Sequence, residues 1–187
     1  HRDLHSFPTR RSSDLGKHVL LCAQVPWDSQ VDAENHPKWL AETVKTLRQH
    51  TDRDIVFRDH PKVVKMRRTR QGGNRSPYDP YRMDDIKGVR ISCRDNIQGD
   101  LETAWAVVCY NSNAAVDATL AGIPCFMSDR CGMAYPVANH DLKDIENPSM
   151  PDREQWAYDL AYAQWCNEEF ESGEAWKHLT RGTEWAV

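Results

Sequence analysis

Residues 105–129 read WAVVCYNSNAAVDATLAGIPCFMSD, and this stretch decides the fold. Its apolar, β-rich run Ala106–Tyr110 predicts a buried strand. Asn111–Asn113 then supplies turn and N-cap residues in front of a helical pattern. Gly122 is placed to end that helix, and Pro124–Met127 starts a second strand. The stretch therefore predicts a strand, a tight turn, a helix and a second strand.

The predicted helix is thin because four of its positions are alanine (114, 115, 118 and 121), so its backbone can lie close to a sheet. A polar turn between a buried parallel strand and a helix is a ready anion site, since free N–H groups and the helix dipole both favour a phosphate there. The alternative is that Asn111 and Ser112 only cap the helix, which such residues usually do. This stretch alone leaves both interpretations open.

The remaining chain alternates strands and helices in the same way. Apolar runs predict strands over 17–23, 54–58 and 87–92, and the helical spacing of Trp39, Leu40, Thr43, Val44 and Leu47 predicts a helix that His36 and Pro37 open. A helical turn is expected over 100–104, and two helices over 152–185. This order predicts an α/β fold, a Rossmann-like, mainly parallel sheet with helices on both faces.

Residues 63–82 interrupt the alternation with a basic stretch rich in Gly and Pro. The simpler interpretation is a solvated or mobile loop. The functional one is a flap that brings positive charge to a phosphate or to an acidic acceptor.

Three polar clusters follow predicted strands: Gln24–Gln30, Arg58–Lys62 and Asn111–Asn113. The carboxyl ends of parallel strands share one rim of a sheet, so these clusters are expected to converge on one ligand. Their chemistry suits a nucleotide. Ser112 and the N–H groups after it can hold a phosphate, His60 and Arg58 can donate to it, and Asp117 can accept ribose hydroxyls.

Three segments carry a resemblance to a known family: LLCAQVPWDSQV (20–31), RDHPK (58–62) and YNSNAAVDATLAGIPCF (110–126). In order and spacing they resemble the GT-B type capsular polysaccharide glycosyltransferases, and most of all the Kdo transferases. The chain then looks like the nucleotide-binding half of such an enzyme. One departure is the turn, which has Asn-Ser-Asn where the family often has paired Ser or Thr.

The resemblance implies roles for individual residues. His60, Pro61, Asn111, Ser112 and Asn113 would bind the phosphate and ribose of the donor. The loop with Gln24, Asp28 and Ser29 would lie on the donor-sugar side.

The resemblance also implies a reaction. The substrates would be a CMP- or UDP-linked sugar and a glycan or glycolipid acceptor, with no metal and no cofactor. The catalytic base would lie in an N-terminal domain that precedes this chain. The enzyme would be cytoplasmic, at the inner face of the membrane.

Other functions fit the same fold. A non-catalytic sugar- or phosphate-binding module would need no base, and fold alone does not separate it from an enzyme. A phage-type transferase that glycosylates DNA bases and a sugar-nucleotide epimerase are further alternatives. The net charge of −4 weighs against general nucleic-acid binding. Six cysteines without a CxxC spacing indicate a reducing compartment and no metal site.

The two ends of the chain are expected to differ. Residues 1–15, HRDLHSFPTRRSSDL, resemble a translated sequencing-library adapter, which points to a metagenomic or draft assembly, and are expected to lack stable packing. Residues 16–150 would form the nucleotide-sugar-binding domain, with the helices of 151–187 packed on it. The tryptophans in those helices suggest core packing, but around Trp165, Phe170 and Trp176 an apolar patch is expected to stay exposed where a second domain would pack.

Overall fold

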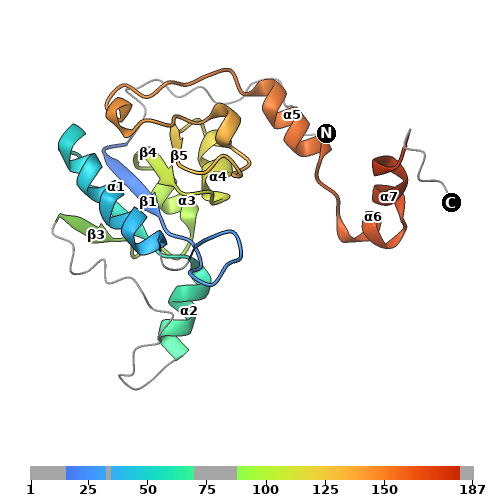
Figure 1. The fold of residues 1–187 in the computed structure, drawn as a ribbon, viewed down its shortest axis with the longest axis horizontal. Coiled ribbons are helices and arrows are strands. Elements are labelled where there is room, and N and C mark those ends of the chain that lie inside the picture. The colour runs from blue at the N-terminus through green and yellow to red at the C-terminus, as the bar shows by residue number, and fades with distance from the viewer. Residues whose placement is uncertain (1–15, 33–34, 70–87, 182–187) are drawn as a thin grey trace. The chain divides into compact units, whose positions relative to one another are not determined.

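The computed structural model describes residues 16–32, 35–69 and 88–181, which are the coloured parts of the ribbon in Figure 1. The prediction for the adapter-like residues 1–15 lies outside this range. The described chain divides into two compact units, with the boundary between Asp152 and Arg153. Each unit is described by itself.

The first unit is built on one five-stranded sheet. The strand order is β3-β2-β1-β4-β5, and every pairing is parallel. This confirms the predicted Rossmann-like α/β fold. The strands are β1 (His18–Cys22), β2 (Ile55–Arg58), β3 (Val89–Ile91), β4 (Ala104–Cys109) and β5 (Cys125–Met127).

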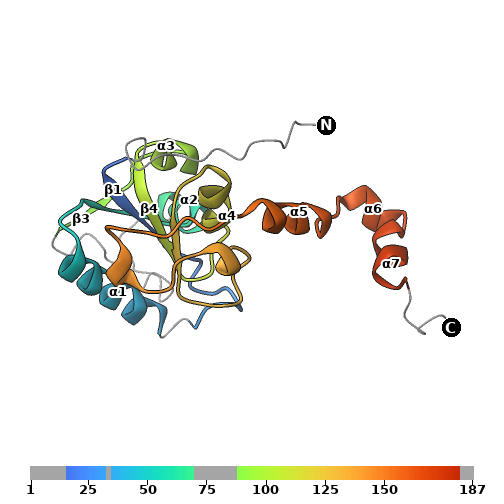
Figure 2. The same cartoon turned by 90° about the horizontal axis from the view of Figure 1, so that it is seen from above.

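Helices cover both faces of the sheet. Figure 2 shows helix α1 (His36–His50) on one of these faces. Alternate strand residues such as Val19, Leu21 and Phe57 share one apolar cluster with Leu40 and Val44 of helix α1 (His36–His50). The intervening residues face the other side, because successive side chains in a strand point to opposite faces. The central strands β1 and β4 are buried on both faces, which explains their largely apolar sequences.

The second face carries three buried cysteines, Cys22, Cys109 and Cys125. The Cys125 thiol lies 3.2 Å from Thr119 Oγ1 on helix α4 (Ala114–Leu120), so α4 covers this face. The alanines of α4 allow this close approach, as predicted. Gly122 has a φ of 76° and follows the last turn of the helix, which confirms its predicted place as the helix stop.

Two boundaries differ from the sequence prediction. Residues 63–69, expected in a loop, belong to helix α2 (Pro61–Thr69), which begins with proline at its first position. The stretch 70–82 lies outside the described residues. Helix α3 (Ile97–Leu101) begins earlier than predicted, because Asn96 caps it by accepting a hydrogen bond from the Gly99 N–H, and residue 104 already belongs to β4.

The segment after β5 closes the first unit. It contains two short 3₁₀ turns, η3 (Tyr135–Val137) and η4 (Leu142–Asp144), and η4 packs against α1. Ile145 joins the apolar cluster, and its carbonyl accepts a hydrogen bond of 2.6 Å from Trp105 Nε1. The returning segment thereby covers the sheet next to α1.

The second unit contains three short helices instead of the predicted two: α5 (Glu154–Tyr162), α6 (Asn167–Glu171) and α7 (Glu174–Leu179). Gly173, in the left-handed region, separates the last two. The tryptophans are not core residues, since Trp156 and Trp165 are only half-buried. Phe170 and Trp176 are 60% and 69% exposed, as predicted for this end of the chain.

No described helix is long and apolar enough to cross a membrane.

His36, at the start of α1, is 2% exposed, and its Nε2 accepts a hydrogen bond of 3.4 Å from the Gln24 N–H. Its ring stacks on Trp39 and meets the edge of Tyr110. Burial lowers the pKa of His36 from 6.5 to about 4. The folded protein therefore keeps this ring neutral at a pH where the unfolded chain protonates it.

We expect His36 to make the protein acid-labile. Because the pKa is lower in the folded state, the stability is complete above pH 6.5 and falls as the pH drops from 6.5 to about 4, by on the order of 3 kcal/mol. Urea unfolding of wild type and His36→Phe between pH 7 and pH 4.5 measures this. The variant should show a flatter pH dependence, and an equal slope in both proteins would contradict the expectation. His50→Phe, at the half-exposed end of the same helix, is the control.

Candidate functional site

The strand order creates one crevice at the carboxyl edge of the sheet. The chain runs from β1 outward to β2 and β3, and then returns to the other side of β1 to form β4 and β5. The connections that leave β1 and β4 therefore diverge, and in open α/β sheets ligands bind at such a switch point. The β1–β4 ladder ends with Cys22 opposite Cys109, so both polar turns start at the same level.

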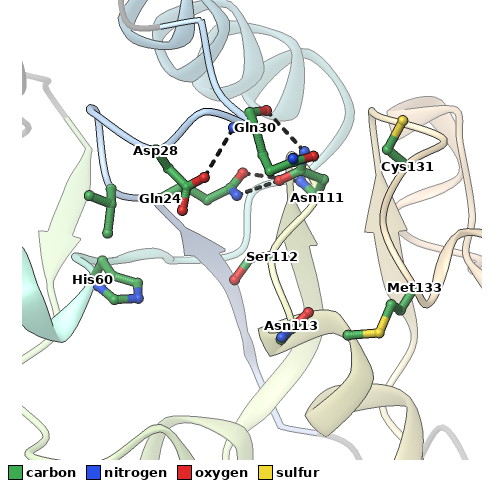
Figure 3. A pocket seen from close by; sticks show the side chains of 10 residues that line it. Gln24, Asp28, Gln30, His60, Asn111, Ser112, Asn113, Cys131 and Met133 are labelled. Carbon is green, nitrogen blue, oxygen red and sulfur yellow. Dashed lines mark hydrogen bonds between the residues drawn. The ribbon is translucent and has the colours of Figure 1, made fainter. Parts of the chain in front are cut away.

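A cavity of about 320 Å³ lies at this switch point (Figure 3). It is lined by residues that follow four of the five strands. They are Gln24, Val25, Asp28 and Gln30 after β1, His60 after β2, Asn111, Ser112 and Asn113 after β4, and Cys131 and Met133 after β5.

Six of the ten residues proposed from the sequence line this cavity: Gln24, Asp28, His60, Asn111, Ser112 and Asn113. The three polar clusters thus meet in one place. Figure 3 shows the side chains of His60, Ser112 and Asn113 around the same open space. The other four residues, Ser29, Arg58, Pro61 and Asp117, are not in the lining. Ser29 and Asp117 are exposed outside it.

Arg58 and Pro61 line a different cavity of about 540 Å³ at the ends of β2 and β3. The Arg58 guanidinium is already engaged there. Its Nη1 lies 2.7 Å from Asp100 Oδ2 and donates to the Arg94 carbonyl at 2.9 Å, and its side chain is only 10% exposed. Ser92 donates to the same carboxylate oxygen of Asp100. In the described structure Arg58 therefore joins the loop after β3 to the end of β2.

His60 presents one defined hydrogen-bond donor to the cavity. Its Nδ1 accepts a hydrogen bond of 3.2 Å from the Lys62 N–H, so the neutral ring carries its proton on Nε2. Burial lowers the pKa of His60, the Lys62 charge lowers it further, and the Asp28 carboxylate raises it. Together these effects lower the pKa of His60, so the ring is neutral at pH 7 and its Nε2–H can donate to a ligand.

Ser112 and Asn113 add donors on the opposite side. Ser112 Oγ accepts a hydrogen bond of 3.3 Å from the Ala114 N–H, which leaves the hydroxyl proton available. The exposed Asn113 side chain does not cap α4. Helix α4 has only seven residues, so side chains contribute more to an anion site here than its dipole does.

Aromatic residues at the start of α1 pack against the turns that line the cavity. The Trp39 ring packs against Tyr110 at 5.4 Å between centroids, and Trp39 Nε1 donates to Ser128 Oγ at 2.9 Å. His36 accepts from the Gln24 N–H, as described above. Through these contacts the start of α1 fixes the turns after β1 and β5.

Four lining residues were not proposed from the sequence as site residues: Val25, Gln30, Cys131 and Met133. Val25 and Gln30 flank proposed residues in one loop. Cys131 and Met133 follow β5, and a signal for them exists, because a polar turn begins at Ser128 directly after a predicted strand. The expectation that ligands bind at the carboxyl ends of the strands, applied to β5 as well, would have found them.

Asp28 is the only charged side chain among the described residues of the lining. The described residues contain no group of three or more His, Cys, Asp or Glu side chains arranged to hold a metal ion. The described site thus combines one carboxylate, several neutral polar groups and a small apolar wall of Val25 and Met133.

The sequence matches no protein-family model and no curated protein. A solved structure of Thermosulfurimonas dismutans KpsC, a beta Kdo 2,4 transferase, resembles the chain with a TM-score of 0.43 and 14% sequence identity. The match covers 70% of this chain and 43% of that one, so the chain spans less than half the length of this neighbour. What the cavity binds has to follow from its own side chains.

The Arg58–Asp100 pair leads to a stability prediction. Removing one partner of a buried pair leaves an uncompensated charge, so Arg58→Ala should destabilise the protein by about 3–5 kcal/mol. Replacing both partners, as in Arg58→Met with Asp100→Leu, should cost much less than either single change. Urea unfolding measures both effects. Lys143→Ala removes half of an exposed pair at 3.6 Å and should change the stability very little, because solvent screens that pair. A loss that small in Arg58→Ala would show that Arg58 is not structural.

Proposed function

We propose that this chain carries the donor-nucleotide site of a glycosyltransferase. The observation that carries the proposal is the convergence of His60, Ser112 and Asn113 on one cavity at the switch point of a parallel sheet. Hydrogen-bond donors on two sides of a small space suit a phosphate. The order of the segments around Gln24–Gln30, His60-Pro61 and Ser112 also resembles the GT-B capsular polysaccharide glycosyltransferases.

The size of the cavity fits part of a donor. A volume of about 320 Å³ is at the lower end of the range for small-molecule sites. It suits a phosphate with an attached ring better than a whole nucleotide sugar. In this arrangement His60 Nε2–H and the Ser112 hydroxyl donate to phosphate oxygens, and the loop with Asp28 and Gln30 borders the sugar.

The charge of the lining favours a donor with few phosphates. Among the described residues of the lining, Asp28 is the only charged one, and it is negative. Each additional phosphate charge would find no compensating cation among these residues, and its desolvation would oppose binding. A CMP-linked sugar, with one phosphate, therefore fits this site better than a UDP-linked sugar. The acceptor would be a glycan or a glycolipid, and the enzyme would act at the inner face of a membrane.

A non-catalytic binding module is the second candidate, and one observation favours it. The described lining holds one carboxylate, Asp28, and its Oδ1 accepts a hydrogen bond of 3.0 Å from the Gln30 N–H, so the described lining offers only a single carboxylate as candidate general base. Incubating the full-length gene product with donor and acceptor distinguishes the two. Sugar transfer supports the enzyme, and donor binding without transfer supports the module.

Calorimetric titration tests the nucleotide site. We expect CMP to bind the full-length product, and UDP and GDP to bind more weakly. Ser112→Ala and His60→Ala should each raise the Kd for CMP roughly 10-fold to 100-fold, because each removes a hydrogen bond to a charged group. Ser172→Ala, an exposed serine in the second unit, should change nothing. If no nucleotide binds, or if the His60 variant binds as well as wild type, the proposal is wrong.

An independent readout uses thiols that are already in the chain. Cys131 lines the cavity, while the exposed Cys93 and Cys166 lie elsewhere. Bound CMP should slow the alkylation of Cys131 by iodoacetamide and leave the two reference thiols unaffected. Equal slowing of all three would indicate a general effect on the protein.

The protonation state of His60 predicts how affinity varies with pH. The neutral Nε2–H form of His60 predominates from pH 7 to 8, since burial lowers the pKa of His60 below its ordinary value of 6.5. The Kd for CMP methyl ester, whose single phosphate charge is constant in this range, should therefore stay flat. An imidazolium contact would instead weaken as the ring loses its proton with rising pH. A steady rise in Kd over this interval would exclude the neutral-donor geometry.

A further inference from the structure

Asn111 lies where three strand ends meet. It follows β4, and its side chain reaches residues that follow β1 and β5. Figure 3 shows it joined by dashed lines to Gln24 and Gln30, above the open space of the cavity. Its backbone N–H donates to Gln24 Oε1 at 3.2 Å, so the two residues bond to each other twice.

The hydrogen-bonding capacity of the Asn111 side chain is used within the protein. Its Nδ2 donates to the Gln30 carbonyl at 3.2 Å and to Asp129 Oδ2 at 2.8 Å. Its Oδ1 accepts from Gln24 Nε2. An asparagine amide has two N–H donors, and both are engaged. A phosphate, which only accepts hydrogen bonds, would therefore find no donor on this side chain.

We infer that Asn111 is a positioning residue, which holds the loop 129–133 and the loop 24–30 in place as opposite walls of the cavity. The inference rests on the proposed function only for the identity of the ligand. The direct donors to that ligand are then His60 and Ser112, and Asn111 acts through the two loops.

The contact with Asp129 extends into the whole loop 129–133. Asp129 Oδ1 accepts a hydrogen bond of 3.0 Å from the Cys131 N–H, and its carbonyl accepts from the Gly132 N–H at 3.2 Å. The Cys131 N–H, and then the Asn111 amide, hold the pKa of Asp129 below its ordinary value, so the carboxylate is charged at neutral pH. The side-chain bond to Asn111, together with the 3.0 Å bond from the Asp129 N–H to the Tyr110 carbonyl, thus holds a loop that is folded around Asp129.

Packing keeps the same loop close to Asn111. A Cβ at Gly132 would lie 3.2 Å from the Asn111 Cα and would collide with the end of the Met127 side chain. Cys131 and Met133, on either side of this glycine, line the cavity. If the bond between Asn111 and Asp129 is lost, this wall should open while the donors of His60 and Ser112 remain in place.

Hydrogen exchange measured by mass spectrometry tests the inference without a ligand. Asn111→Asp replaces the donor by a carboxylate that faces Asp129, and should speed exchange in a peptide covering 128–134 roughly 10-fold to 100-fold. The exchanged pair, Asn111→Asp with Asp129→Asn, restores one donor and one acceptor with the same net charge. It should return the rate to within about threefold of wild type.

Two controls accompany this experiment. Ser112→Ala should leave exchange in the peptide unchanged, since the Ser112 hydroxyl accepts its hydrogen bond from the Ala114 N–H and not from the loop 129–133. A peptide covering η4 serves as a reference within each protein. If the Asn111→Asp chain does not fold, Asp129→Ala removes the same bond from the other side and should speed exchange in the same peptide.

The inference is overturned if exchange in 128–134 is unchanged in the foldable single variant, or if the exchanged pair stays as fast as Asn111→Asp. Titration of the same proteins with CMP separates this inference from the proposed function. Weak binding by Asn111→Asp and recovery in the exchanged pair support both. If wild type binds no nucleotide, the proposed function fails, and the exchange result still decides the role of Asn111.

Discussion

The parallel pairing of β1 with β4 is the constraint on which the rest of this structure depends. These two strands are far apart in sequence, yet they form the centre of the sheet, and their ladder ends with Cys22 opposite Cys109. The turns that follow therefore begin side by side, which brings Gln24 within hydrogen-bond distance of Asn111. Because both strands are buried on both faces, one residue of slippage would leave the apolar runs in place but separate those turns.

The cavity depends on neutral groups, and this has a physical consequence. A site made of guanidinium and ammonium groups attracts any polyphosphate, whereas a site with one carboxylate and several neutral donors selects by geometry. The one nearby guanidinium proposed as a ligand group, Arg58, is held by Asp100. If the cavity binds the donor as proposed, the cost of burying charge would limit how many phosphates enter, and the directions of the His60 and Ser112 donors would decide where one lies.

Much of the fold could be predicted from the sequence, because the strands are short apolar runs and Gly122 marks a helix end. The meeting of Gln24, His60 and Ser112 also followed from strand order alone. The role of Arg58 could not be predicted, since its partner Asp100 lies far along the chain and a strand-end arginine suits a phosphate equally well. Helix α2 was missed because basic residues and the nearby glycines suggested a loop, although Pro61 is a favourable first residue. Trp156 and Trp165 of the second unit are only half-buried although their spacing suggested core packing, since spacing alone does not show whether a partner surface is present.

The division of the six cysteines has a practical consequence. Cys22, Cys109 and Cys125 are sealed inside the sheet unit, while Cys93, Cys131 and Cys166 are exposed in three separate places. The folded chain should therefore titrate as a three-thiol protein and the unfolded chain as a six-thiol protein. After brief alkylation, mass spectrometry separates chains that carry three modified thiols from chains that carry six. The proportion of three-thiol chains gives the folded fraction of a preparation. In air, intermolecular disulfides should join chains through the exposed set only, so a reductant is needed to keep preparations monodisperse.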